Sequence, residues 1–327
     1  IVDMNLKSKI LTHVRCNIGD VDRAIATGVD GIDIVIGTSS YLRQFSHGKS
    51  IQQIKQMAKE VIEYIQAKDE NIEIRFSTED SFRSDIDDLM DIYSFVSELN
   101  ISRVGIADTV GIAAPDQVYK LVSQIYQVIN QKKCDIEIHL HNDTGCAIAN
   151  SYMAIKAGAK YIDTCVLGIG ERNGIVPLGG FLSRMIPINK QYVQSKYKLK
   201  ELKNLENYIC NHCDIQIPFN NYITGYAAFT HKAGIHAKAV LNNPETYECL
   251  DPTDFGLKRY IHIAHELTGW NAIKDRVEQL NLNLSNEEIK QLTEYIKSVA
   301  SVKKCNLSDV DNILINHQEY LPRALKQ

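Results

Sequence analysis

Residues 136–143 read Ile136-Glu137-Ile138-His139-Leu140-His141-Asn142-Asp143. Apolar and polar residues alternate in this stretch, which is typical of a β-strand, and two histidines stand at its end. Because side chains alternate across a strand, His139 and His141 are expected on one face, where two imidazoles can bind one metal ion. Taken alone, the pattern also fits two histidines that only form hydrogen bonds near the core. The surrounding sequence therefore has to decide between a metal site and a structural role.

Six short apolar runs of this kind occur in the first half of the chain. They cover residues 9–14, 31–36, 72–77, 103–108, 136–141 and 161–166. Segments such as 50–68 and 116–131 lie between them and carry apolar residues at helical spacing. Alternating strands and helices predict parallel strands joined by right-handed crossovers. The first strand is not followed by G-x-G-x-x-G, so nothing favours an open nucleotide-binding sheet over a barrel.

Polar side chains stand at or just after the last apolar position of each run. They are His13, Arg15, Asp33, Arg75, Ser77, Glu79, Asp108, Thr109, His139, His141 and Asp163. In a barrel these positions converge on one mouth, whereas in an open sheet those at opposite edges would lie far apart. The sequence therefore predicts an α/β fold of the TIM (β/α)8 type.

Five motifs then carry a resemblance to a known family. They are Arg75-Phe76-Ser77-Thr78-Glu79-Asp80, Ala107-Asp108-Thr109-Val110-Gly111, His139-Leu140-His141-Asn142-Asp143-Thr144-Gly145, Gly168-Ile169-Gly170-Glu171-Arg172-Asn173-Gly174 and His231-Lys232-Ala233-Gly234-Ile235-His236-Ala237. Their content and order resemble the homocitrate synthases, which belong with the isopropylmalate synthases among metal-dependent TIM-barrel enzymes. The resemblance is nearest to the fungal enzymes of lysine biosynthesis and covers nearly the whole chain.

The resemblance also implies what precedes and follows these motifs. Family members begin with a strand carrying an Arg-Glu-Gly-Glu-Gln-like segment, followed by a second strand, and neither is found here. We therefore expect an incomplete barrel over 1–186, with strands three to eight of the family's eight, and helical subdomains over 187–327. We interpret the sequence as part of a longer enzyme; a shortened, inactive, lysine-binding paralogue is the alternative.

The implied reaction condenses acetyl-CoA with 2-oxoglutarate to give homocitrate and CoA, the first step of the α-aminoadipate route to lysine. The resemblance assigns the divalent metal to His139 and His141, together with an acidic residue of the missing segment. Zinc is the first choice, with manganese, magnesium, cobalt or iron as alternatives. The substrate would be bound by residues at the barrel mouth, namely His13, Arg75, Ser77, Glu79 and Thr109. Without the family, Arg75 could equally form a salt bridge with Glu79 or Asp108.

Two further roles follow from the resemblance. His236 and Tyr247 would be the catalytic pair, brought to the site by the C-terminal subdomain of the partner in a homodimer. Asp33 and Glu137 would bind the ammonium group of lysine as a feedback inhibitor, because carboxylates in apolar strands are costly unless they are paired. The alternative for Glu137 is an outward side chain facing a lysine of a helix.

Composition is that of an ordinary enzyme. The net charge of −4 over 327 residues gives no indication of nucleic-acid binding, and no apolar run is long enough to span a membrane. Eight cysteines predict reduced thiols in an intracellular compartment, either cytoplasm and nucleus or mitochondrion. An isopropylmalate or citramalate synthase, or a related lyase, is the alternative to a homocitrate synthase, and a test of different keto acids separates them.

The C-terminal region is expected to be helical. Residues 198–211 show an amphipathic pattern, and Ser285-Asn286-Glu287-Glu288 is a capping box that predicts a helix toward Val299. Another helix is expected from Leu307, and Trp270 is expected to pack inside the subdomain.

Overall fold

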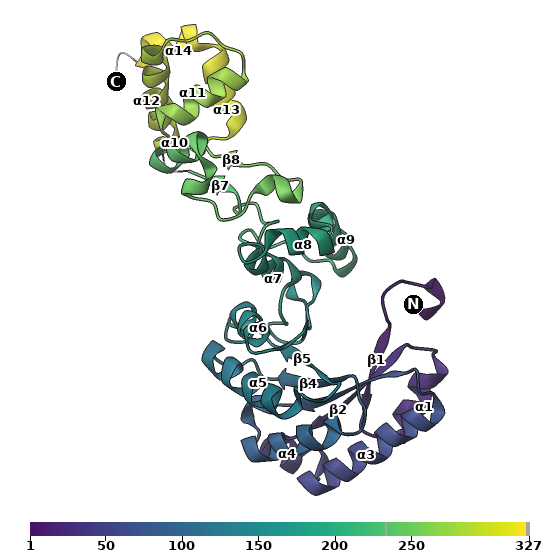
Figure 1. Cartoon of the computed structure of the whole chain (residues 1–327). Helices are drawn as coiled ribbons and strands as arrows, with labels where there is room; N and C mark the ends of the chain where they lie inside the picture. Colours follow the sequence, from purple (N-terminus) through teal and green to yellow (C-terminus); the bar gives the residue numbers. More distant parts are fainter. Residues whose placement is uncertain (233, 325–327) are drawn as a thin grey trace. The chain divides into compact units, whose positions relative to one another are not determined.

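A computed structural model describes residues 1–232 and 234–324 of the chain. The chain divides into two compact units, Ile1–Arg184 and Met185–Gln327, and each is described here by itself (Figure 1). In the part of the chain that the structure describes, no helix is long and apolar enough to cross a membrane.

The first unit is built on one parallel sheet of six strands in the order β1-β2-β3-β4-β5-β6. The strands are β1 Leu11–Arg15, β2 Gly31–Gly37, β3 Glu73–Glu79, β4 Arg103–Asp108, β5 Asp135–Leu140 and β6 Tyr161–Ile162. The strand order equals the chain order, as in a barrel wall, and each crossover passes through helix or loop. The expectation of an incomplete barrel with six parallel strands is confirmed.

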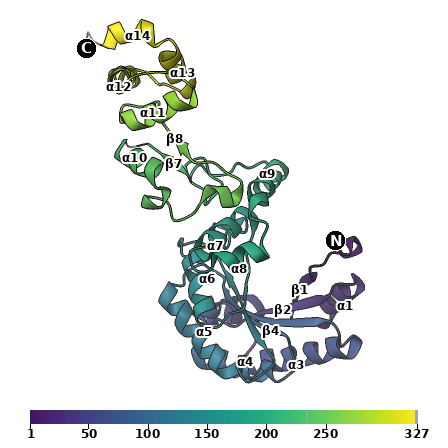
Figure 2. The same ribbon diagram turned by 45° about the horizontal axis from the view of Figure 1, so that its top comes forward.

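The helices of this unit separate the strands. They are α1 Ile18–Ala26, α2 Ser40–Leu42, α3 Ile51–Lys68, α4 Ile86–Ser97, α5 Pro115–Ile129, α6 Ala147–Lys156 and α7 Leu178–Met185, with short turns η1 Val2–Met4, η2 Arg43–His47, η3 Ser81–Arg83 and η4 Val166–Gly168. Helices α1, α3, α4 and α5 all lie on one side of the sheet (Figures 1 and 2). Helix α3 begins after Ser50, whose side chain forms a capping box with Gln53.

The two faces of the sheet differ in chemistry. The face toward the helices is apolar and fully buried, and includes Ile32, Ile34, Ile74, Phe76, Val104, Ile106, Ile136, Ile138 and Leu140. The alternate positions of the same strands carry charged and polar groups on the opposite face, among them Asp33, Arg75, Arg103, Glu137 and His139. Since side chains alternate along a strand, the apolar face forms the core while the polar face remains available for a site.

Strand β6 is shorter than the sequence predicts. Only Tyr161 and Ile162 pair with β5, although the apolar run extends to Val166. Cys165 instead bridges to Pro177, and its N–H donates to the carbonyl of Val176. The chain leaves the sheet because Cys165 forms its backbone hydrogen bonds with Val176 and Leu178.

The second unit is mainly helical. Its elements are α8 Lys190–Lys196, η5 Leu199–Glu201, α9 Leu202–Cys213, β7 Thr230–His231, α10 Gly234–Asn242, η6 Pro244–Thr246, η7 Pro252–Phe255, β8 Tyr260–Ile261, α11 Trp270–Gln279, α12 Asn286–Val302, α13 Leu307–Ile315 and α14 His317–Ala324. Strands β7 and β8 form a separate parallel pair. The predicted helix over 198–211 is thus present as η5 and α9, beginning at Leu199 and ending at Cys213.

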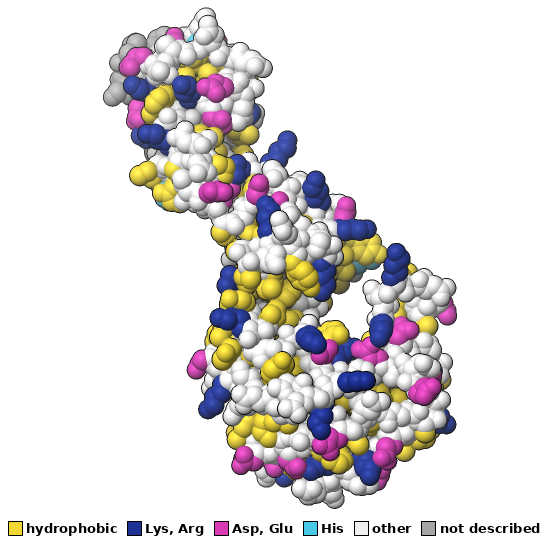
Figure 3. Space-filling view, viewed as in Figure 1, with side chains coloured by type: hydrophobic (Ala, Val, Ile, Leu, Met, Phe, Trp, Pro, Cys, Tyr) yellow, Lys and Arg dark blue, Asp and Glu magenta, His cyan; other side chains and the backbone are white. Residues whose placement is uncertain are grey.

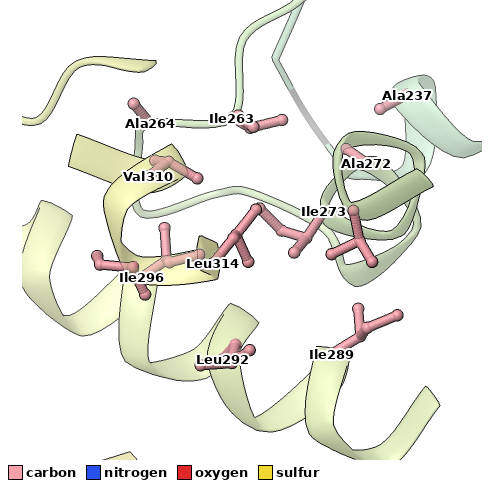
Figure 4. Packing of buried hydrophobic residues seen from close by; sticks show 12 residues of the cluster. Ala237, Ile263, Ala264, Ala272, Ile273, Ile289, Leu292, Ile296, Val310 and Leu314 are labelled. Carbon is pink, nitrogen blue, oxygen red and sulfur yellow. The ribbon is translucent and has the colours of Figure 1, made fainter. Parts of the chain in front are cut away.

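One apolar cluster joins the last helices (Figure 4). Ile273 of α11, Leu292 of α12 and Leu314 of α13 are completely or almost completely inaccessible, and Trp270 packs against them as expected. The capping box is present, since Ser285 accepts from the N–H of Glu288 while Glu288 accepts from the N–H of Ser285. The helices predicted at residues 286 and 307 are therefore confirmed.

Candidate active site

The paired histidines point their ring nitrogens at one another at the end of β5. Nε2 of His139 lies 3.2 Å from Nε2 of His141. Two imidazoles bound to one zinc ion at about 2.1 Å in tetrahedral geometry would place their nitrogens about 3.4 Å apart. The spacing therefore fits two adjacent ligands of a divalent cation.

The tautomers support this arrangement. Nδ1 of His139 lies 3.0 Å from a carboxylate oxygen of Asp163, so it donates its proton there and leaves a lone pair on Nε2. Nδ1 of His141 is buried and finds no hydrogen-bond partner among the described residues. Burial, together with the neighbouring His139 and Arg172, lowers the pKa of His141, which favours the neutral imidazole that a metal needs. Within residues 1–232 and 234–324 no group of three or more His, Cys, Asp and Glu side chains forms a complete site.

A buried arginine stands at the centre of the polar face. The guanidinium of Arg75 donates to the carboxylates of Asp33 and Glu137, and Nη1 lies 3.4 Å from Asp163. Arg75 is 6 % exposed, and Asp33 and Glu137 are still less exposed. Neither Asp108 nor Glu79, the two partners that the sequence offered for a salt bridge, pairs with this arginine. The outward orientation considered for Glu137 is wrong, because its partners are arginines of the inner face.

Asp33 is held in its charged form by three neighbours. Burial alone would raise its pKa, but hydrogen bonds from His13 and Arg75 outweigh burial and lower it. Ser77 also donates to Asp33 at 2.7 Å, and Nε2 of His13 lies 2.8 Å from the other carboxylate oxygen. The hydrogen bond to Asp33 is the main reason that the pKa of His13 is raised.

The position beside Ser77 has to be glycine. Gly105 pairs with Ser77 across β3 and β4 and with Glu137 across β4 and β5. A Cβ at residue 105 would lie 2.0 Å from the hydroxyl oxygen of Ser77. Gly105 therefore leaves the space in which Ser77 reaches Asp33.

The loops at the strand ends are tied together by a second arginine. Arg172 donates to both carboxylate oxygens of Asp143, at 2.8 and 3.0 Å, and to the backbone carbonyl of Thr109. The hydroxyl of Thr109 accepts from the N–H of Asp80 at 2.8 Å. Asp108 accepts from the N–H groups of Ile112 and Ala113, while burial raises its pKa. These bonds fix the loops around the mouth.

These groups enclose a pocket of about 170 Å³ at the ends of the strands. Its lining includes nearly all of the site residues that the sequence predicts in this unit, namely His13, Arg75, Ser77, Glu79, Thr109, Glu137, His139 and His141, together with Asp163, Glu171 and Arg172. Asp33 contacts Arg75 from the sheet, although it does not itself line the pocket. Burial raises the pKa of Glu79 in the pocket wall.

The remaining predicted residues lie in the second unit. The rings of His236 and Tyr247 are 4.3 Å apart between centroids, so the two side chains lie side by side. His231 is bound instead to Glu248, which also pairs with Arg259.

Sequence reasoning assigned no role to three residues that shape the site. Asp163, predicted only as a polar residue at a strand end, orients His139. Arg172 joins the loops that carry Thr109 and Asp143. Arg103 of β4 donates to Glu137 at 2.6 Å and pairs with Glu73. An arginine at the start of a predicted strand was the available signal for Arg103, but its partners depend on the register of three strands.

Two family patterns match the chain. The pattern described as HMGL-like matches residues 1–209, and that described as "Homocitrate synthase post-HMGL domain-like" matches residues 223–304. The fold is similar to that of a hydroxymethylglutaryl-CoA lyase from Pseudomonas aeruginosa, with a TM-score of 0.55 and 17 % identity over 71 % of this chain and 75 % of that chain. The fold and site thus define a barrel protein of the HMGL-like class.

Proteins of similar sequence show to which family within this class the chain belongs. The chain is 58 % identical over 316 residues to the cytosolic homocitrate synthase isozyme of Saccharomyces cerevisiae, covering 97 % of this chain and 73 % of that protein. It is 56 % identical over 324 residues to the mitochondrial homocitrate synthase of Schizosaccharomyces pombe, covering 99 % of this chain and 76 % of that protein. The chain belongs to the homocitrate synthase family and spans about three quarters of the length of these relatives.

Proposed function

We propose that this protein condenses acetyl-CoA with 2-oxoglutarate, giving homocitrate and CoA, at the pocket of the six-stranded unit. The observation that carries the proposal is the fixed guanidinium of Arg75 in the same pocket as the paired imidazoles of His139 and His141. A dicarboxylic keto acid needs a cation at its far end and a metal at its ketone end.

In this proposal, Arg75 binds the carboxylate of 2-oxoglutarate that is farther from the ketone. Its two carboxylate partners hold the guanidinium plane, so the substrate meets a cation whose orientation is already set. Ser77 and His13 lie beside it, and Thr109 would contact the carboxylate next to the ketone. A branched aliphatic keto acid has no second carboxylate with which Arg75 could pair.

His139 and His141 would hold the divalent metal, with zinc as the first choice. When bound, such a cation polarises the ketone and stabilises the alkoxide. The hydrogen bond from His139 to Asp163 fixes the imidazole that would act as ligand.

His236, oriented by its ring contact with Tyr247, would be the base of the reaction. A proton leaves the methyl group of the thioester for the imidazole, and the methyl carbon forms a bond to the ketone carbon. The ketone oxygen then takes up a proton to become a hydroxyl group. Hydrolysis of the thioester releases CoA and homocitrate. We propose that this histidine comes from the partner subunit of a homodimer.

Lysine, the end product of the route, would be the feedback inhibitor, bound through its ammonium group by Asp33 and Glu137. Both carboxylates lie next to Arg75, which would bind the substrate, so lysine and 2-oxoglutarate would compete. The relatives include cytosolic and mitochondrial enzymes, and we propose one of these two compartments for this protein.

The test measures release of the CoA thiol from acetyl-CoA by the protein in its full natural length, supplied with zinc, manganese, magnesium or cobalt. Activity is expected with 2-oxoglutarate and not with 2-oxoisovalerate. Calorimetric titration of 2-oxoglutarate into the chain measures binding independently of turnover, and Arg75→Ala should abolish it. Preference for the branched keto acid, or equal binding of 2-oxoglutarate by Arg75→Ala, would contradict the proposal.

A further inference from the structure

A second buried arginine lies beneath the pocket and touches none of its open surface. Arg103 begins β4 on the same face as Arg75, directly opposite it in the strand register. It is 8 % exposed and is absent from the pocket lining. Its guanidinium stacks on the ring of Tyr161 at 4.5 Å and donates to Glu73 and Glu137.

Glu137 is the shared partner of both arginines. One of its oxygens accepts from Arg75, and the other accepts from Arg103 at 2.6 Å. Glu137 is 5 % exposed, so water contributes little to balancing its charge. Two like-charged guanidinium groups can lie on neighbouring strands because this carboxylate stands between them.

Carboxylates outnumber guanidinium groups on this face. Asp33, Glu137 and Asp163 surround the single guanidinium of Arg75. Arg103 supplies a second positive charge and occupies one oxygen of Glu137. Its removal would leave that oxygen without a donor and would make the floor of the pocket more negative.

We propose that Arg103 is a positioning residue that sets how strongly the pocket prefers a dicarboxylate over an ammonium-bearing inhibitor. The inference rests on the function proposed above. By binding Glu137, Arg103 keeps this carboxylate directed at Arg75 and lowers its capacity to accept an ammonium group. The opposite charges of the two ligands make the effect of Arg103 opposite for each of them.

The test uses Arg103→Met in the full chain, with calorimetric titrations of 2-oxoglutarate and of lysine. The variant should bind 2-oxoglutarate about tenfold more weakly and lysine about tenfold more tightly than the parent protein, since each change corresponds to roughly one charged hydrogen bond. The matched control is Lys9→Met, because Lys9 also pairs with Glu73 but its side chain is 67 % exposed. This control should leave the ratio of the two dissociation constants unchanged.

Two further variants keep the test decisive if Arg103→Met folds poorly. Arg103→Lys retains the charge but cannot donate to both carboxylates through one fork, so it should shift the ratio in the same direction by a smaller factor. Arg103→Met combined with Glu137→Gln removes both charges and should abolish the tighter binding of lysine. Far-UV circular dichroism and a cooperative thermal transition establish that each variant is folded.

If Arg103 were only structural, its substitution would weaken the binding of both ligands. That result in the folded variants would overturn the inference. The same holds if the ratio of dissociation constants does not change. If the parent protein binds both ligands while Arg103→Met leaves their ratio unaltered, the inference fails and the proposed function stands. If the parent protein fails to bind 2-oxoglutarate, the proposed function itself fails.

Discussion

Substitution of Gly105 by alanine should disturb the substrate pocket through one side chain. The new Cβ would lie 2.0 Å from Oγ, 2.8 Å from Cβ and 3.2 Å from Cα of Ser77. Rotation of the hydroxyl relieves only the first contact, because Cβ and Cα belong to the strand itself. We therefore expect overpacking that costs about 1–3 kcal/mol of unfolding free energy.

Binding of 2-oxoglutarate should weaken as well as stability. Displacement of the Ser77 hydroxyl breaks its 2.7 Å hydrogen bond to Asp33 and leaves this buried carboxylate with His13 and Arg75 alone. Chemical denaturation measures the free energy of unfolding, and calorimetric titration of 2-oxoglutarate measures its dissociation constant at the pocket. Binding should weaken by about tenfold, which equals roughly 1.4 kcal/mol.

Two variants serve as controls for this prediction. Gly19→Ala places a methyl group at 3.5 Å from the nearest side-chain atom and should stabilise α1 or leave it unchanged. Ser77→Gly removes the two side-chain atoms nearest to the new methyl group, so the double variant with Gly105→Ala should be less destabilised than the sum of the two single changes. Full additivity, or unchanged stability of Gly105→Ala, would refute the steric reasoning.

Three further predictions concern the metal, the substrate and the pH dependence. Asp163→Asn should weaken zinc binding by about 10–100-fold, measured by competition with a chelating dye, because the proton on His139 loses its charged acceptor; unchanged affinity would argue against these ligands. Arg75→Lys should bind 2-oxoglutarate more weakly despite its charge, as a lysine cannot bridge Asp33 and Glu137, and equal calorimetric affinity would contradict that role. For Glu248, burial would raise the pKa, but hydrogen bonds from Arg259 and His231 lower it below its usual 4.5. Its folded-state pKa is thus depressed, so its stabilisation is present above about pH 4.5 and is lost as pH falls through the lowered pKa. The difference in unfolding free energy between parent and Glu248→Gln should shrink below pH 4.5, and a constant difference would contradict the assignment.

Local patterns were sufficient to predict the sheet and the paired histidines. Alternation in residues 136–141 places His139 and His141 on one face whatever the rest of the fold does. The capping residues Ser50 and Ser285 act within four residues of chain and are similarly visible in the sequence. Strand β6 ends early because its pairing competes with backbone hydrogen bonds between Cys165 and both Val176 and Leu178, which no local pattern contains.

The partners of charged residues could not be predicted in the same way. Arg75 had Glu79 and Asp108 as apparent partners because they are close in sequence or stand at strand ends. The structure pairs it with Asp33 and Glu137 because strand register places these groups beside it on the inner face. The pairing of residues that lie 34 to 62 positions apart in the chain depends on strand register in the folded sheet. The contact between Arg103 and Glu137 could therefore not be predicted either.

The division between an apolar and a polar face explains how the sheet can hold several buried charged side chains. The apolar face, packed against α1, α3, α4 and α5, supplies the burial that stabilises the unit. On the face shown in Figure 3, Lys and Arg side chains are interspersed with Asp and Glu, so this face is not dominated by charges of one sign. The buried cluster around Arg75 is different, because three carboxylates face one guanidinium in the pocket wall. Well-packed apolar residues could replace such ion pairs without loss of stability. We therefore propose that the cluster is kept for recognition, because a fixed cation flanked by anions can distinguish a carboxylate ligand from an ammonium ligand in one small pocket.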